Sequence, residues 1–122
     1  MKASFASEPG AVPEIRRRTQ EIAERAGLGP NARDDLLVAV SEAATNAVLH
    51  SRSPRLEVEW KRSRDRIIVS VRDEGTFEEP AEAKQRGWGL HLIGATTDDV
   101  VLRPGTAQRP GTEVRLVKRI TA

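Results

Sequence analysis

Two polar side chains, Glu42 and Asn46, stand out in an otherwise largely apolar stretch that runs from Leu36 to His50. Side chains four residues apart on a helix are neighbours on one face. A carboxylate in apolar surroundings is costly unless it has a partner, a metal or a chemical task. The pair therefore fits a site that needs a carboxylate and an amide oxygen in one cavity. It also fits a helix acid beside a polar surface amide.

The stretch that carries this pair predicts a central helix mostly enclosed by protein. Apolar residues recur on one side at helical spacing, and further apolar residues occupy the other side: Leu36, Leu37, Val40, Ala44, Ala47 and Val48, then Val38, Ala39 and Leu49. Asn31 is predicted to cap the helix, with Asp34 and Asp35 in its first turn. The stretch 51–54 ends in a proline and is predicted to stop it near His50.

The remaining elements alternate between helix and strand patterns. The pattern predicts a strand at 4–7, an amphipathic helix from Pro13 to Ala26, a hairpin of strands 55–61 and 66–72, a short apolar helix at 87–94, and strands at 99–103 and 111–119. This order indicates an α+β fold. We expect a two-layer sandwich in which a mainly antiparallel or mixed sheet of about four to five strands carries about three helices on one face.

Length and composition restrict the class of protein. A chain of 122 residues suggests one domain, spanning 1–122. The absence of cysteine excludes disulfides and thiolate metal sites, and 20 basic against 18 acidic residues argue against a nucleic-acid partner. No apolar run could span a bilayer, so we expect no membrane partner and a cytoplasmic location.

Three glycine-containing signals follow the helix pair along the chain. Asp73 and Gly75 come directly after a strand, Gly87 and Gly89 open the predicted short helix, and Gly111 with Thr112 opens the last strand. Each signal alone is common in turns. Their order is more specific: a helix acid and amide, then Asp-x-Gly, a loop, Gly-x-Gly-Leu, and a late Gly-Thr.

In this order the chain resembles the GHKL ATPase superfamily, and within it the small bacterial anti-sigma-factor serine kinases of the RsbW and SpoIIAB type. The resemblance covers nearly the whole chain and is carried by segments 41–50, 71–75 and 86–93, together with the opening at 5–9. It implies a Bergerat-type ATP-binding fold, with ATP and Mg²⁺ as cofactors. Whether two copies pair as a homodimer is left open by the sequence.

The resemblance implies a role for each polar residue of the motifs. Asn46 would hold Mg²⁺ through its amide oxygen, which suits a hard cation. Glu42 would act as the general base that takes the proton from the attacking hydroxyl. Asp73 would accept a hydrogen bond from the adenine amino group, and Thr112 would help to fix that contact.

The glycine boxes are implied to bring backbone close to the nucleotide. Gly75 would let the chain approach the ring, and Gly87, Gly89 and Leu90 would form the helix start whose N–H groups face the phosphates. Arg86 fits a phosphate contact and equally a solvated loop arginine. One departure from the family pattern is Phe77, which stands where the first glycine box usually has its second glycine.

The function implied is an ATP-binding anti-sigma factor with protein serine kinase activity. Its expected partners are a sigma factor and a STAS-type anti-sigma factor antagonist, a serine of which would receive the phosphate. The alternative is an ATP-binding regulatory module that sequesters a protein partner without phosphotransfer. The loop from Phe77 to Arg86 is short, which favours that alternative.

Overall fold

A computed structural model describes residues 1–50, 54–73, 96–103, 108 and 111–120. The elements are β1 (Lys2–Ala6), α1 (Ala11–Arg25), α2 (Pro30–His50), β2 (Arg55–Arg62), β3 (Arg66–Arg72), β4 (Asp99–Arg103) and β5 (Glu113–Arg119). The predicted short helix at 87–94 lies outside the described residues. No helix in the described part of the chain is long and apolar enough to cross a membrane.

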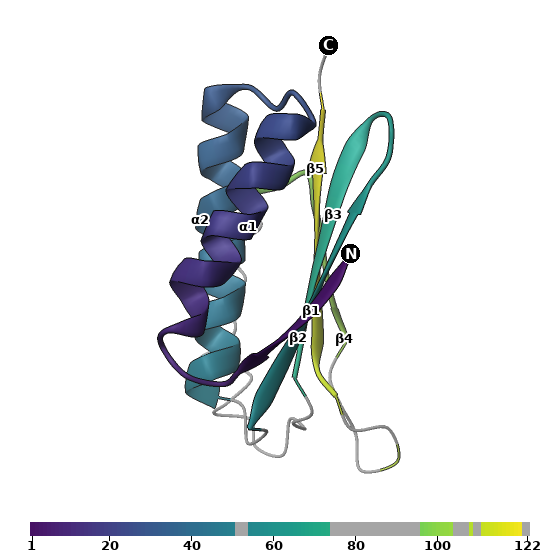
Figure 1. Cartoon of the computed structure of the whole chain (residues 1–122). Coiled ribbons are helices and arrows are strands. Elements are labelled where there is room, and N and C mark those ends of the chain that lie inside the picture. Colours follow the sequence, from purple (N-terminus) through teal and green to yellow (C-terminus); the bar gives the residue numbers. More distant parts are fainter. Residues whose placement is uncertain (51–53, 74–95, 104–107, 109–110, 121–122) are drawn as a thin grey trace.

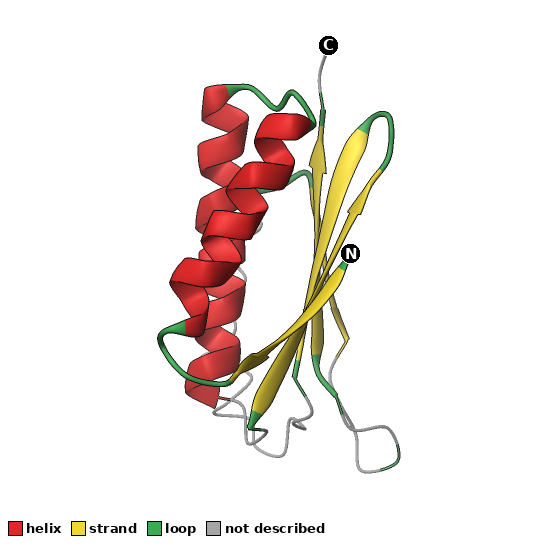
Figure 2. Ribbon diagram, viewed as in Figure 1, coloured by secondary structure: helices red, strands yellow, loops and turns green. Residues whose placement is uncertain are grey.

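The elements form two layers. The five strands lie in the order β1-β2-β3-β5-β4, and each neighbouring pair is antiparallel. Both described helices cover the same face of this sheet, and the opposite face carries no described helix (Figures 1 and 2). The expected α+β sandwich with a mainly antiparallel sheet is therefore confirmed.

Alternation along the strands decides which face the helices cover. In β2, Leu56, Val58 and Trp60 are buried, while the residues between them point to the other face. Val58 lies opposite Val71 in the neighbouring strand, so apolar side chains continue across the sheet. This apolar face of the sheet forms half of the core.

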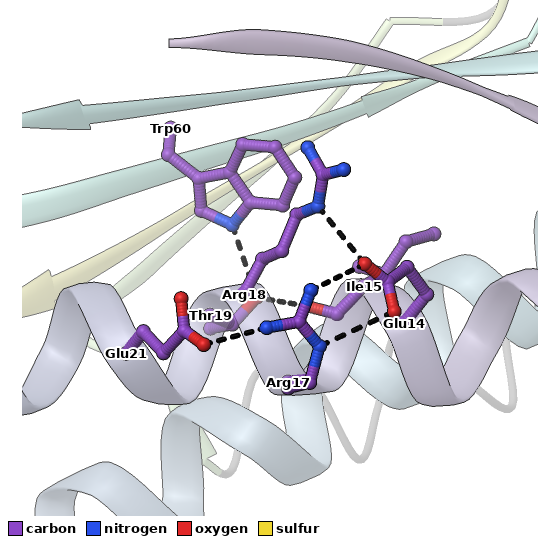
Figure 3. Close-up of polar contacts among 7 residues, drawn as sticks. All are labelled: Glu14, Ile15, Arg17, Arg18, Thr19, Glu21 and Trp60. Atoms are coloured by element: carbon purple, nitrogen blue, oxygen red, sulfur yellow. Dashed lines mark hydrogen bonds and ion pairs between the residues drawn. The ribbon is translucent and has the colours of Figure 1, made fainter.

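Helix α1 packs against the sheet through one buried stripe, which includes Ile15 and Thr19. The Trp60 indole Nε1 donates a hydrogen bond to Thr19 Oγ1 at 3.0 Å, and this hydroxyl donates to the Ile15 carbonyl oxygen at 2.8 Å (Figure 3). Phe5 of β1 meets Trp60 edge to face and carries the Arg18 guanidinium 5.3 Å from its ring centroid. Two polar groups are thereby satisfied inside the layer contact.

Helix α2 differs from its prediction in two respects. It begins at Pro30, so Asn31 lies in the first turn instead of capping it, and Asp34 and Asp35 fall in the second turn. Proline suits the first position of a helix because its missing N–H would have no helical partner there. The predicted enclosure holds for most of the stretch but fails at two residues, because Val38 is 41% exposed and Leu49 is 68% exposed. Their side of α2 turns away from the sheet.

Candidate functional site

The site lies at one end of the sheet, where β3 ends and β5 begins. Arg72 and Glu113 are partners in the register of these strands, so the next residues outward, Asp73 and Thr112, also lie opposite each other. The Asp73 N–H donates to the Thr112 carbonyl oxygen at 3.0 Å, and the Thr112 N–H donates to Asp73 Oδ1 at 3.4 Å. Each residue is only 2% exposed. Antiparallel pairing therefore continues past the strands and holds a buried carboxylate.

Asp73 and Thr112 line a hollow between the sheet and helix α2. Asn46 reaches the same hollow from α2, and its other lining residues are small or apolar: Ala43, Ala47, Val71, Leu102 and Val114. The cavity volume is about 10 Å³, close to the minimum that holds one water molecule. A ring could enter only if the walls moved apart.

Gly111 allows the close approach that forms this pair. Its φ of +121° lies in a region that residues with a side chain rarely adopt. An added Cβ would stand 2.9 Å from Arg72 Nε and 3.2 Å from the Asp73 carbonyl oxygen. The arginine could move, but the carbonyl is fixed by the backbone. A glycine is therefore required one residue before Thr112.

Glu42 and Asn46 stand one turn apart on α2 but differ in surroundings. Both are half-buried. Asn46 lines the hollow, and Glu42 is not among the described residues that line it. At 100° per residue, Glu42 lies on the same side of α2 as the exposed Val38 and Leu49. The carboxylate therefore sits beside the hollow, on the solvent side of its rim.

Of the predicted site residues, the structure brings Asn46, Asp73 and Thr112 together and places Glu42 next to them. Gly75, Arg86, Gly87, Gly89 and Leu90 lie outside the described residues. Figure 1 shows that α2, β3 and β5 reach the same lower end of the molecule, which explains how residues so far apart in sequence meet.

Sequence reasoning missed the small residues on the floor of the hollow. Ala43 and Ala47 stand one helical turn apart on α2 and leave room below Asn46. Leu102 on β4 closes another side. The run Ala43-Ala44 followed by Ala47 was a usable signal, because several alanines on one face of a buried helix bring its backbone close to its neighbour.

The polar groups around the hollow are suited to hold an adenine nucleotide and Mg²⁺. A buried carboxylate beside an apolar hollow can accept a hydrogen bond from an amino group on a flat ring. An amide oxygen is a suitable ligand for a hard cation that keeps most of its waters. Asn46, Asp73 and Thr112 would thus hold these two groups.

The described part of the chain is thus a two-layer α+β domain with a buried acid and an amide around one hollow. The model of the histidine kinase-like ATPase domain matches residues 5–118. The chain therefore belongs to the histidine kinase-like ATPase domain family, as its motifs predict.

The similar curated proteins are serine-protein kinases named RsbW. The protein from Listeria innocua is 36% identical in an alignment of length 101, and the match covers 66% of this chain and 64% of that protein. The one from Oceanobacillus iheyensis is 32% identical over 114 residues, covering 77% of this chain and 72% of that protein. The match therefore spans somewhat less than two thirds of the Listeria protein.

Two solved structures share the fold at low identity. The structure of the RsbU and RsbW domains of Rv1364c from Mycobacterium tuberculosis matches with a TM-score of 0.74 at 19% identity, covering 100% of this chain and 33% of that one. The SiaB–SiaC complex from Pseudomonas aeruginosa matches with a TM-score of 0.64 at 14% identity, covering 96% of this chain and 89% of that one.

Proposed function

We propose that this protein is an ATP-dependent protein serine kinase that acts as an anti-sigma factor in a partner-switching pathway. The observation that carries the proposal is the shared hollow of Asn46, Asp73 and Thr112, in a chain that belongs to the histidine kinase-like ATPase family. The RsbW names of its relatives support the kinase activity. The substrate would be a serine of a STAS-type antagonist, and the sequestered partner would be a sigma factor.

In this proposal the chain's residues divide the work of binding and proton transfer. Asp73 accepts a hydrogen bond from the adenine amino group, while the Thr112 N–H keeps its carboxylate oriented. Asn46 holds Mg²⁺ through its amide oxygen, and bound Mg·ATP supplies the phosphoryl group. Glu42 accepts the proton from the serine hydroxyl as that oxygen bonds to phosphorus and ADP leaves. Its place on the solvent side of the rim lets a protein substrate reach it.

Nucleotide titration tests the binding half of the proposal. Calorimetry with Mg²⁺ present should detect ATP binding, and GTP should bind at least about tenfold more weakly. Guanine presents an acceptor oxygen where adenine has its amino group, so a carboxylate would face an acceptor. No heat with ATP, or equal affinity for GTP, would contradict the adenine site.

Glu42→Gln tests the chemical half. Phosphate transfer from labelled ATP to STAS-type proteins of the same genome should fall by about 10²–10⁴-fold, because a positioned general base contributes on that scale. ATP affinity should stay the same, since Glu42 does not line the hollow. Glu8→Gln, a change of the same kind at an exposed acid, is the matched control. Undiminished transfer by Glu42→Gln would remove this residue from the chemistry.

The second candidate is a regulatory module that binds ATP without transferring phosphate. Glu42 is not among the described residues that line the hollow, and the sequence between Phe77 and Arg86 is short; both observations favour this candidate. It predicts the same ATP affinity but no labelled antagonist. Nucleotide-dependent binding of a sigma factor would then be its only readout.

A further inference from the structure

Lys118 stands on the face of the sheet that the helices cover. In β5 the alternation that buries Val114 and Leu116 on this face continues to Lys118. Lys118 is also the register partner of Ile67, which is fully buried. Only 13% of the lysine side chain is exposed. A cation with so little access to water is costly unless polar groups surround it, so this position requires partners for the ammonium group.

The Lys118 ammonium group has partners in two other parts of the chain. Its Nζ lies 3.6 Å from Asp35 Oδ2, in the second turn of α2, and donates a hydrogen bond to the Thr96 carbonyl oxygen at 3.2 Å. Thr96 precedes β4 by two residues. The lysine therefore connects α2 with β5 and with the chain that leads into β4.

Asp35 has a particular place around the axis of α2. At 100° per residue, Asn46 lies about 20° to one side of Asp35 and Glu42 about 20° to the other. Asn46 lines the hollow, and Glu42 is not among the described residues that do so. Because α2 carries apolar residues on most of its circumference, apolar packing fixes its rotation only weakly. A polar contact at Asp35 fixes the rotation at the boundary between the two side chains.

Helix α2 and strand β5 meet at two points. Near the start of α2 the contact is the ion pair of Asp35 with Lys118, and near its end Asn46 and Thr112 line the same hollow. The two acceptor side chains of α2 are about 17 Å apart along the helix, and Lys118 and Thr112 are about 20 Å apart along the strand. A turn of α2 about its axis would move Asn46 and would also separate the ion pair.

We propose that Lys118 positions α2 for the nucleotide site, so that Asn46 turns into the hollow and Glu42 stays on its rim. The inference rests on the proposed function, in which Asn46 holds Mg²⁺. Lys118 acts through Asp35 and Thr96, because it lies at the end of β5 far from Thr112 and does not line the hollow. Its contribution is to orient the helix that carries both polar side chains.

ATP titrations with and without Mg²⁺ separate positioning from a merely structural role. Lys118→Met keeps an unbranched side chain without the charge. The gain in ATP affinity that Mg²⁺ provides should fall by about tenfold, as when a residue that supports a metal ligand is removed. Affinity measured in the presence of a chelator should stay the same, and Lys118→Arg should regain most of the magnesium effect. A magnesium effect that Lys118→Met leaves unchanged would overturn the proposal.

The acidic partner gives a second variant, which does not depend on the folding of Lys118→Met. The Asp35 side chain is 52% exposed, so Asp35→Asn removes its charge at little cost to the core. It should show the same loss of the magnesium effect, and the double variant should be no worse than either single one. Losses that add in the double variant would contradict the ion pair as the cause. Asp34→Asn, at the exposed neighbouring acid, is the matched control and should bind normally.

A readout without nucleotide keeps this inference separate from the proposed function. The chain has no cysteine, so Asn46→Cys introduces a single thiol that reports the rotation of α2. Lys118→Met should speed its reaction with iodoacetamide by about threefold or more, because position 46 then turns out of the hollow. A thiol at the exposed Gln20 on α1 should react equally fast with and without the lysine.

The two proposals fail on different results of this labelling experiment. Equal rates at position 46 with and without Lys118 would overturn the positioning role, whatever the protein binds. A faster rate together with no ATP binding by the wild type would support the positioning of α2 by Lys118 and contradict only the nucleotide site.

Discussion

Two buried polar pairs connect distant parts of the chain, and they differ in what lies beside them. Between α1 and β2, the Thr19 hydroxyl accepts from Trp60 Nε1 and donates to the Ile15 carbonyl oxygen. At the end of β3, Asp73 and Thr112 exchange hydrogen bonds at 3.0 and 3.4 Å beside a hollow. The first pair is enclosed by packed side chains, whereas the second borders a space.

The difference separates a polar pair that stabilises the fold from one that is suited to binding. A threonine hydroxyl has one hydrogen to donate, and in the helix contact both its donor and an acceptor position are used inside the core. A carboxylate has several acceptor positions, and Asp73 keeps its carboxylate at the wall of a hollow that also contains Asn46. Burial alone does not distinguish them, because Thr19 is 1% exposed and Asp73 is 2% exposed.

The largest expected effect is on ATP binding when Asp73 becomes Asn. An amide has a single acceptor oxygen, so either the Thr112 N–H or the adenine amino group would face an NH₂ group. ATP affinity should fall by about 100-fold, and the melting temperature should change little. Calorimetry and a thermal melt measure the two quantities. Asp34→Asn, at an exposed site on α2, is the matched control and should bind normally.

If Asp73→Asn bound ATP with wild-type affinity, the distinction between the two pairs would fail. The hollow would then be a packing defect beside a structural pair. A variant that loses both affinity and fold would be uninformative about binding, so the melt decides which result counts.

A smaller effect is expected at Gly111, where stability and binding should change together. Gly111→Ala forces a residue with a side chain to a φ of +121° and a Cβ to 3.2 Å from the Asp73 carbonyl oxygen. Unfolding free energy should fall by about 1–3 kcal/mol. ATP affinity should fall too, because the Asp73–Thr112 pair shifts. Gly10→Ala is the matched control, since a Cβ there meets nothing within 4 Å.

The expected difference in stability between Gly111→Ala and Gly10→Ala can be tested directly. Equal unfolding free energies for the two alanine variants, measured in urea, would show that the close approach at Gly111 does not constrain the site.

The fold followed from the sequence because its signals are local and periodic. Strict alternation in β2 and β3 assigned Trp60 and Val69 to the covered face, and both are buried. The start of α2 was mispredicted because two start signals compete there: Asn31 is a good cap, but Pro30 already has the φ of a first helical residue. The exposure of Val38 depends on what packs against α2, which periodicity cannot supply.

The candidate site was predictable only in part. Spacing along α2 placed Glu42 beside Asn46, and the order of the motifs linked both with Asp73 and Thr112. That Asn46 lines the hollow and Glu42 stands outside its lining depends on the rotation of α2 about its axis. Four residues at 100° each place the two side chains only about 40° apart around the axis, and no sequence pattern specifies the rotation that closely.

Thr19→Val should affect stability and leave ATP binding unchanged. The substitution keeps the shape but leaves the buried Trp60 indole N–H without its acceptor, so unfolding free energy should fall by about 1–2 kcal/mol. The same change in a Trp60→Phe background should cost less, because no indole N–H remains. Urea denaturation of the wild type, the two single variants and the double variant gives the coupling free energy between Thr19 and Trp60. Weaker ATP binding by Thr19→Val would show that the two ends of the molecule are linked.

The smallest change in stability is expected from a substitution on the exposed side of α1. Hydrogen bonds from Arg17 and Arg18 hold the pKa of Glu14 below its usual value (Figure 3). A carboxyl whose pKa is lower in the folded state stabilises the fold above its unfolded pKa, and this contribution is lost as pH falls through the folded pKa. Glu14→Gln should therefore lower the urea midpoint slightly at pH 7 and not at all in acid.

Salt should reduce the effect of Glu14→Gln, because the pair is solvent-exposed and screened. Asp34→Asn, at an exposed acid that forms no ion pair with the described residues, should show neither the pH dependence nor the salt dependence. If Glu14→Gln lowered the unfolding free energy as much as Thr19→Val does, the exposed side of α1 would stabilise the molecule as much as its buried side. The enclosed hydrogen bonds of Thr19 would then no longer be what distinguishes the helix contact from the Asp73–Thr112 pair.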